Sequence, residues 1–198
     1  MKERIEQYFR DSGIPHDEVE TLAYRYYVDY GLAIRGLVEK HPEIDVRDYN
    51  DKVDGALPLE RVLRKDPALR EMILSMNVGK KWLFTNAGES HAKRVISILG
   101  LDGVFQGMTF CDYTHPRFVC KPDQKAFEKA MREAGVQDPS LCYFVDDSLP
   151  NIERASAVGW TAVHVEESLP ADAKTGSLRI RSVLDLPSVL PQFWARDS

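Results

Sequence analysis

Two adjacent carboxylates, Asp146 and Asp147, end an apolar run that starts at Leu141, and a predicted helix begins at Pro150. This pattern predicts a buried strand that carries both acids to the edge of a parallel sheet, where open α/β folds bind ligands. Because neighbouring carboxylates repel each other and lose hydration together, we expect a positive partner beside them. Mg²⁺ suits the position, since it prefers oxygen ligands. An ordinary turn is an equal alternative, because Asp, Ser and Pro are common in turns.

Two other predicted strand-to-helix junctions carry polar groups. Thr85 and Asn86 follow a strand-like segment, and Lys121 precedes a predicted helix. A hydroxyl and the N–H groups of a helix N-terminus can hold a phosphate, whose charge a lysine can balance. Taken singly, Thr85 is more often a turn residue and Lys121 a solvated lysine. Together with the acidic pair, in this chain order, they indicate phosphoryl chemistry assisted by a metal.

The elements that must position these residues change in character along the chain. Apolar residues recur at helical spacing through about residue 65, with Asp17 and Glu20 resembling a capping box. Asp66 and Pro67 then predict a helix start. Beyond them strands alternate with helices, which predicts an α/β fold with a doubly wound parallel sheet. The predicted strands cover residues 80–84, 104–111, 141–146, 160–165 and 178–180.

Composition and charge limit the partners and the compartment that we expect for this protein. Hydrophobic residues make up 43% and charged residues 29% of 198 positions, which is ordinary for a globular protein. A net charge of −5 without a Lys/Arg run predicts neither a nucleic-acid nor a membrane partner. Three cysteines without CxxC spacing predict a reducing compartment. With a charged N-terminal stretch, this predicts a soluble protein of the cytoplasm or of the nucleus. The sequence does not predict an oligomeric state.

The chain order of the polar groups separates two families. Receiver domains of response regulators also combine an acidic pair, a Thr and a Lys, but there the acidic pair comes first. The order here resembles the haloacid dehalogenase-like (HAD) phosphatase superfamily, whose motifs run Thr or Ser, then Lys, then a paired acid. Five segments are similar to the fungal pyrimidine 5′-nucleotidases of that superfamily: Tyr30–Leu37, Trp82–Ala87, Phe110–Tyr113, Val119–Pro122 and Phe144–Asn151.

The resemblance implies roles for five residues at the strand ends. Thr85 and Lys121 would be catalytic, with Thr85 and Asn86 gripping the phosphoryl group and Lys121 balancing its charge. Asp146 would bind Mg²⁺ directly, and Asp147 would help directly or through water. The implied reaction is hydrolysis of a nucleoside 5′-monophosphate, UMP or CMP, through an aspartyl-phosphate.

The resemblance also implies a division of the chain into a helical cap over residues 1–66 and a HAD-like core over residues 67–198. Asn151 would orient the acidic loop, or serve only as a helix-start residue. Arg35, on the cap, would contact the substrate, or play a structural part. Other phosphomonoesters such as lysophosphatidate are alternative substrates, because phosphatases with this type of cap accept them.

One motif of the family is missing. Its first strand ends in Asp-x-Asp, which supplies the nucleophile and the general acid/base, and this sequence has no two aspartates at that spacing. That strand would lie centrally, between the strands that end at Thr85 and Asp146. We therefore expect little or no catalysis from the chain as written. The sequence is then a truncated form of an enzyme or a non-catalytic, phosphate-binding relative; replacement of the nucleophile by a residue such as Asp112 is the least favoured explanation.

Overall fold

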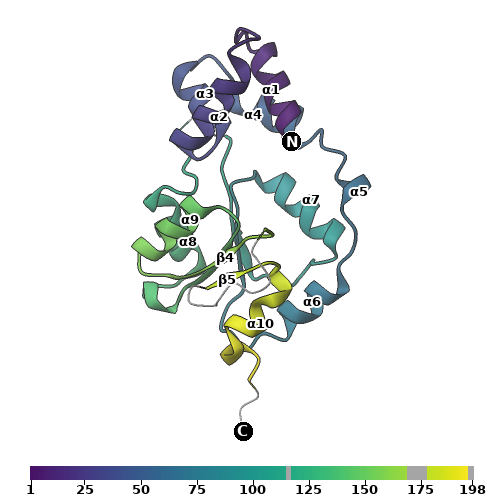
Figure 1. Cartoon of the computed structure of the whole chain (residues 1–198), viewed down its shortest axis with the longest axis vertical. Coiled ribbons are helices and arrows are strands. Elements are labelled where there is room, and N and C mark those ends of the chain that lie inside the picture. Colours follow the sequence, from purple (N-terminus) through teal and green to yellow (C-terminus); the bar gives the residue numbers. More distant parts are fainter. Residues whose placement is uncertain (115–116, 169–177, 196–198) are drawn as a thin grey trace.

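The computed structural model describes residues 1–114, 117–168 and 178–195. A helical part at one end stands over a second part in which helices flank short parallel strands (Figure 1). Helices α8 and α9 lie on one side of the strands, and α6 and α7 lie on the other (Figure 1). The predicted α/β class is thereby confirmed. The last three residues of the predicted core lie outside the described part of the chain.

The helical part has its own apolar core, in which Phe9, Ile34 and Leu37 are fully buried. Gly36 lets α2 and α3 approach closely, because a Cβ at this position would lie 2.4 Å from the Cβ of Tyr26. As predicted, the described residues before 65 form no strand. The helices of this part are α1 (Lys2–Asp11), α2 (Val19–Tyr30), α3 (Ala33–Lys40), α4 (Val46–Tyr49), the π-helical turn η1 (Asn50–Asp54) and α5 (Leu59–Val62).

Helix starts show one confirmed and one wrong prediction. Asp66 caps α6 (Pro67–Leu74) as expected, because its side chain accepts a hydrogen bond of 2.9 Å from Leu69 N. The prediction of a capping box formed by Asp17 and Glu20 is wrong. A turn closed by the Glu18 N to Pro15 O bond leads directly into α2, so Glu18 occupies the cap position and makes no side-chain cap bond.

The strands form two sheets in the described residues, and the break falls between β1 and β3, where the resemblance places the missing first strand. All pairs are parallel, with β1 beside β2 and, separately, β3 beside β4 and β4 beside β5. Strands β1 and β3 therefore face each other without a shared ladder. The strands are β1 (Trp82–Phe84), β2 (Gly107–Thr109), β3 (Tyr143–Asp146), β4 (Thr161–Val165) and β5 (Arg179–Ile180).

Aromatic side chains fill the space between the two sheets. Phe84 of β1 lies 5.8 Å from Phe144 of β3, and Phe127 of α8 contacts both rings, at 5.2 and 5.6 Å between centroids. The prediction that the acidic strand is buried holds only for Phe144, since Tyr143 is 44% exposed. This strand lacks a ladder partner on the side of β1, so that edge is open, and Tyr143 packs against Phe193 with 4.7 Å between the ring centroids.

Helices α7 and α8 end at the glycines that the sequence predicted as helix ends. Gly100 and Gly135 end α7 and α8 with φ of 73° and 70°, the left-handed backbone that glycine favours. Strand β2 is shorter than predicted because the chain still turns at Val104, whose N–H donates to Leu101 O. No described helix is long and apolar enough to cross a membrane. These elements are α7 (Glu89–Leu99), α8 (Gln124–Ala134), η2 (Pro139–Leu141), α9 (Leu149–Ala157), η3 (Val183–Asp185), α10 (Leu186–Val189) and η4 (Pro191–Phe193).

Candidate functional site

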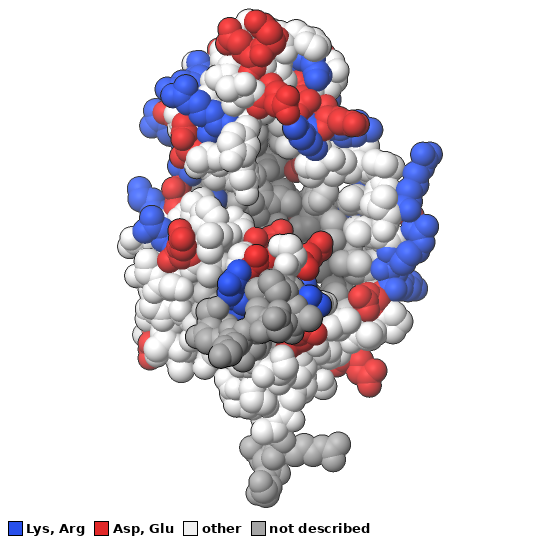
Figure 2. Space-filling model, in the orientation of Figure 1, with Lys and Arg blue, Asp and Glu red and all other residues white. Residues whose placement is uncertain are grey.

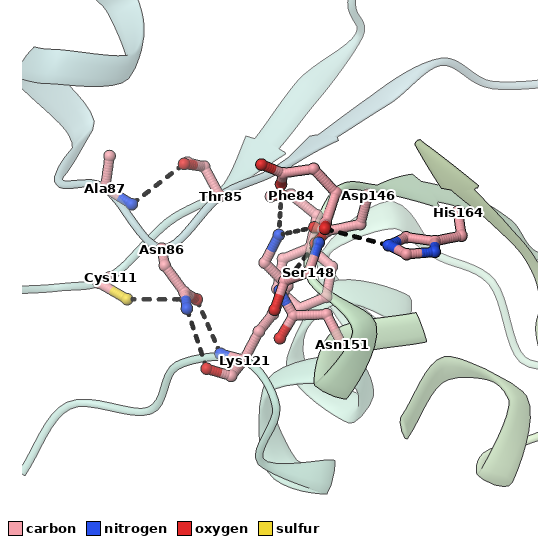
Figure 3. Close-up of polar contacts among 11 residues, drawn as sticks. Phe84, Thr85, Asn86, Ala87, Cys111, Lys121, Asp146, Ser148, Asn151 and His164 are labelled. Carbon is pink, nitrogen blue, oxygen red and sulfur yellow. Dashed lines mark hydrogen bonds and ion pairs between the residues drawn. The ribbon is translucent and has the colours of Figure 1, made fainter. Parts of the chain in front are cut away.

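Three helices begin beside the carboxyl ends of β1 and β3. Helix α7 follows the loop after β1, α9 follows the loop after β3, and α8 starts just after Lys121. Asn86 points toward the backbone of Lys121, and the side chains of Lys121 and Asn151 point toward Asp146 (Figure 3). The Thr85 hydroxyl points toward Ala87 N. We call this group the strand-end site; it consists of Thr85, Asn86, Lys121, Asp146 and Asn151.

Lys121 joins the two sheets. Its Nζ donates to Phe84 O at the end of β1, at 2.9 Å, and to Asp146 Oδ2 at the end of β3, at 2.6 Å (Figure 3). Both side chains are almost enclosed, with 6% of Lys121 and 8% of Asp146 exposed. The Phe84 and Phe144 rings lie 4.9 and 5.2 Å from the ammonium group, close enough to add cation–π attraction. Lys121 therefore replaces a missing backbone ladder with a charged bridge.

The second carboxylate oxygen of Asp146 is also engaged. Asp146 Oδ1 accepts hydrogen bonds of 2.9 Å from the backbone N–H of Ser148 and from Nδ2 of Asn151. Asn151 is buried at the start of α9. The amide therefore holds the acidic loop against the helix, which is the position that the sequence suggested for it.

Asn86 holds the backbone of Lys121 from both sides. Its Oδ1 accepts from Lys121 N at 2.7 Å, and its Nδ2 donates to Lys121 O at 2.9 Å. Thr85 Oγ1 accepts from Ala87 N at 3.0 Å, which leaves its hydroxyl proton available to another acceptor. In this arrangement Asn86 positions the lysine, and Thr85 retains a free donor.

Arg35 lies away from the other predicted site residues. Its guanidinium pairs with Asp123 Oδ2 at 2.5 Å and donates to Tyr30 O and to Cys120 Sγ at 3.4 and 3.5 Å. The contact with Cys111, and after it the contact with Arg35, hold the pKa of the Cys120 thiol below its ordinary value, although burial acts in the opposite direction. Arg35 therefore joins the helical part to the segment that carries Lys121.

A cavity of about 1010 Å³ opens between the helical part and the strand ends, and the surface is hollowed there (Figure 2). Arg35 does not line it among the described residues. The predicted site residues that line it are Thr85, Asn86, Lys121, Asp146, Asp147 and Asn151.

Sequence reasoning missed a second polar group in the same cavity, which we call the tyrosine wall: Tyr49, Asp54, His91 and Tyr113. Asp54 ends the π-helical turn η1, and His91 lies in the first turn of α7. Tyr113 OH donates to Asn86 O at 3.1 Å, which connects the wall to the strand-end site. The sequence offered a weak sign of this group: Asp54 follows the apolar Val53 in a segment that otherwise resembles a connecting turn.

The described residues do not make up a magnesium site by themselves. No group of three His, Cys, Asp or Glu side chains is arranged to hold a metal in the described part of the chain. Both oxygens of Asp146 already have partners, and Asp147 is exposed. Mg²⁺ takes near-octahedral oxygen coordination, so these two carboxylates would need further ligands.

Comparison with known proteins identifies relatives for most of the chain. The family model described as "haloacid dehalogenase-like hydrolase" matches residues 1–159. Phosphate metabolism protein 8 of Saccharomyces cerevisiae is 36% identical over an alignment of 169 residues, which covers 80% of this chain and 53% of that protein. The chain thus spans about half the length of this relative.

Solved structures show the same fold at low identity. A dehalogenase with an intermediate complex has a TM-score of 0.58 and 16% identity, covering 98% of this chain and 92% of that one. A HAD-family enzyme of Bacteroides thetaiotaomicron, in complex with magnesium and inorganic phosphate, has a TM-score of 0.51 and 18% identity, covering 87% and 90%. A HAD phosphatase of Thermococcus onnurineus has a TM-score of 0.51 and 19% identity, covering 96% and 87%.

Proposed function

Because the chain belongs to the haloacid dehalogenase-like hydrolase family, we propose that it binds the phosphoryl group of a small phosphomonoester at the strand-end site. It would thus supply the phosphate-recognition part of a phosphatase. The observation that carries this proposal is the enclosed ammonium group of Lys121, held between two strand ends at the wall of a large cavity.

Helix N-termini and hydrogen-bond donors favour an anion at this position. The N-termini of α7, α8 and α9 all lie at the strand-end site, and each carries partial positive charge from unpaired N–H groups. Lys121 adds a full positive charge that Asp146 balances. Thr85 offers a free hydroxyl donor, and Asn86 fixes the backbone from which the lysine reaches the cavity.

We propose that residues 1–66 form a cap over the core of residues 67–198. The support is that the helical part has a separate apolar core and forms the far side of the cavity. Gly31, between α2 and α3, packs so tightly on the core that a Cβ there would lie 2.4 Å from Lys121 O. The cap would exclude water from a bound phosphomonoester.

UMP or CMP hydrolysis is the specific activity that we propose for the complete catalytic unit. Mg²⁺ is the proposed cofactor, because a structural neighbour carries magnesium with inorganic phosphate. The two carboxylates of this chain are too few to hold it, so we route no step through the ion. Since the sequence contains no Asp-x-Asp pair, we expect the 198-residue chain to bind phosphate but to release it from UMP slowly or not at all.

The test is phosphate release from UMP with Mg²⁺, together with inorganic-phosphate binding by calorimetry, for the wild type and Asp146→Asn. We expect binding of phosphate without turnover. Rapid release that Asp146→Asn abolishes would show that another residue serves as the nucleophile. Absence of both binding and turnover in a folded chain would refute the proposed function.

A further inference from the structure

The tyrosine wall contains a buried carboxylate without a hydrogen-bond donor. Asp54 is 5% exposed, and no hydrogen bond to its side-chain oxygens is found among the described residues. These oxygens face the cavity, because the fully buried side-chain atoms without a partner in the described part of the chain belong to Glu6 and Arg10. The hydrogen bonds at this residue go to its backbone oxygen, from Leu57 N at 3.4 Å and from the His91 ring at Nδ1, 3.3 Å away. Asp54 therefore differs from most buried polar side chains, which have partners.

The buried carboxylate of Asp54 and the groups around it have shifted pKa values. Burial raises the pKa of Asp54, and the interaction with His91 acts in the opposite direction. Burial, and after it the nearby carboxylate, raise the pKa of Tyr49, and the same two effects contribute to the raised pKa of Tyr113. A buried polar atom without a partner is destabilising, so a stable fold alone gives no reason for an acid here. Residues that break a local folding rule in this way occur most often at functional sites.

Two structural observations place this carboxylate at a ligand site. Asp54 lines the same cavity as Lys121, and it ends a π-helical turn, a feature found frequently at functional sites. The cavity volume of about 1010 Å³ exceeds what a phosphate ion alone would occupy. A ligand bound through its phosphoryl group would thus extend its organic part into the remaining space.

We propose that the Asp54 carboxylate accepts a hydrogen bond from a hydroxyl or N–H group on the organic part of the phosphomonoester. The inference rests on the proposed function, because the strand-end site holds the other end of the ligand. Asp54 is then a specificity residue: it favours ligands that bring a donor and disfavours those that leave it unpaired. The chemical class that fits is a phosphomonoester of a polyol, sugar or nucleoside.

The test compares pairs of ligands that differ in a donor group. The pairs are glycerol 3-phosphate with n-propyl phosphate, UMP with its 2′,3′-dideoxy analogue, and UMP with its N3-methyl analogue. Calorimetry gives the affinity of each for the wild type, Asp54→Leu and Asp54→Asn. Asp51→Asn is the matched control, since Asp51 is an exposed acid of the same turn.

In the wild type, at least one ligand that carries the donor should bind about tenfold more tightly than its partner, the scale of a hydrogen bond to a charged group. Asp54→Leu should remove that difference, Asp54→Asn should reduce it, and Asp51→Asn should preserve it. Inorganic phosphate should bind all four proteins within about twofold. Equal ratios in every protein, or equal loss of inorganic phosphate in the Asp54 variants, would overturn the inference. Failure of the wild type to bind inorganic phosphate would refute the proposed function and this inference with it.

Discussion

Two aspartates that line one cavity have contrasting surroundings. Asp146, between the sheets, accepts hydrogen bonds from Lys121, Ser148 and Asn151. Asp54, on the tyrosine wall, has no donor to its carboxylate in the described residues. The two residues thus present the same chemical group in a fully paired and in an unpaired state.

The contrast separates what holds the fold from what is available to a ligand. Removing one member of a buried ion pair is strongly destabilising, because it leaves the other charge unpaired. Removing a buried carboxylate that has no partner relieves a penalty. We therefore expect changes of opposite sign in the free energy of unfolding when the Asp146 pair is broken and when Asp54 is replaced.

Lys121→Met should lower the free energy of unfolding by about 3–5 kcal/mol, because it leaves the Asp146 carboxylate buried without its cation. Urea denaturation of the variant and of the wild type measures this. Lys121→Met combined with Asp146→Asn should recover much of the loss, because no unpaired charge remains. A double variant as unstable as the single one would show that packing, not charge, joins the two sheets.

Asn86→Ala should lower the free energy of unfolding by about 1–3 kcal/mol, because the N–H and C=O of Lys121 lose their partners in a buried place. It should also weaken phosphate binding by disordering the lysine. Asn77→Ala, at an exposed position, is the control for the same denaturation experiment. Unchanged stability with weaker binding would instead indicate that Asn86 contacts the phosphate directly.

Asp54→Leu should raise the free energy of unfolding by about 1 kcal/mol at pH 8, because the folded state no longer encloses an unpaired charge. The folded-state pKa of Asp54 is raised by burial, so its contribution to wild-type stability is complete below the unfolded pKa of about 3.9 and is lost as the pH rises through the folded pKa. The difference in the free energy of unfolding between the variant and the wild type should therefore increase with pH. The facing groups Tyr49, His91 and Tyr113 are unchanged in the variant.

Melting temperatures between pH 4 and pH 8 measure this difference. A variant that is less stable than the wild type throughout would show that Asp54 has a structural partner and would remove the contrast with Asp146.

Arg35→Lys should change the free energy of unfolding by less than about 1 kcal/mol, because its pair with Asp123 is partly exposed and solvent weakens such pairs. UMP affinity, measured by calorimetry, should stay within about twofold, since Arg35 does not line the cavity among the described residues. A tenfold loss of UMP affinity would support the substrate contact that the resemblance suggested.

Local chemistry determined what the sequence could predict. The cap at Asp66 and the glycine that ends α7 depend on neighbours within a few residues, and both predictions are confirmed. The sequence predicted that Thr85, Lys121 and Asp146 lie close together, because parallel strands bring their carboxyl ends to one edge of a sheet. The division into two sheets follows the missing first motif, because the resemblance places the strand of that motif between the strands that end at Thr85 and Asp146. Asp54 gave only a weak signal, an acid after an apolar residue, because its burial depends on the packing of the π-helical turn and not on its neighbours in the sequence.

The most direct test of the phosphoryl site is calorimetric titration of inorganic phosphate into the wild type and into Lys121→Met combined with Asp146→Asn. The double variant leaves no unpaired charge and removes the ammonium group. If Lys121 holds the phosphoryl group, the wild type should bind one phosphate and the double variant should bind at least tenfold more weakly. Equal affinity in two folded proteins would contradict a phosphoryl site at Lys121.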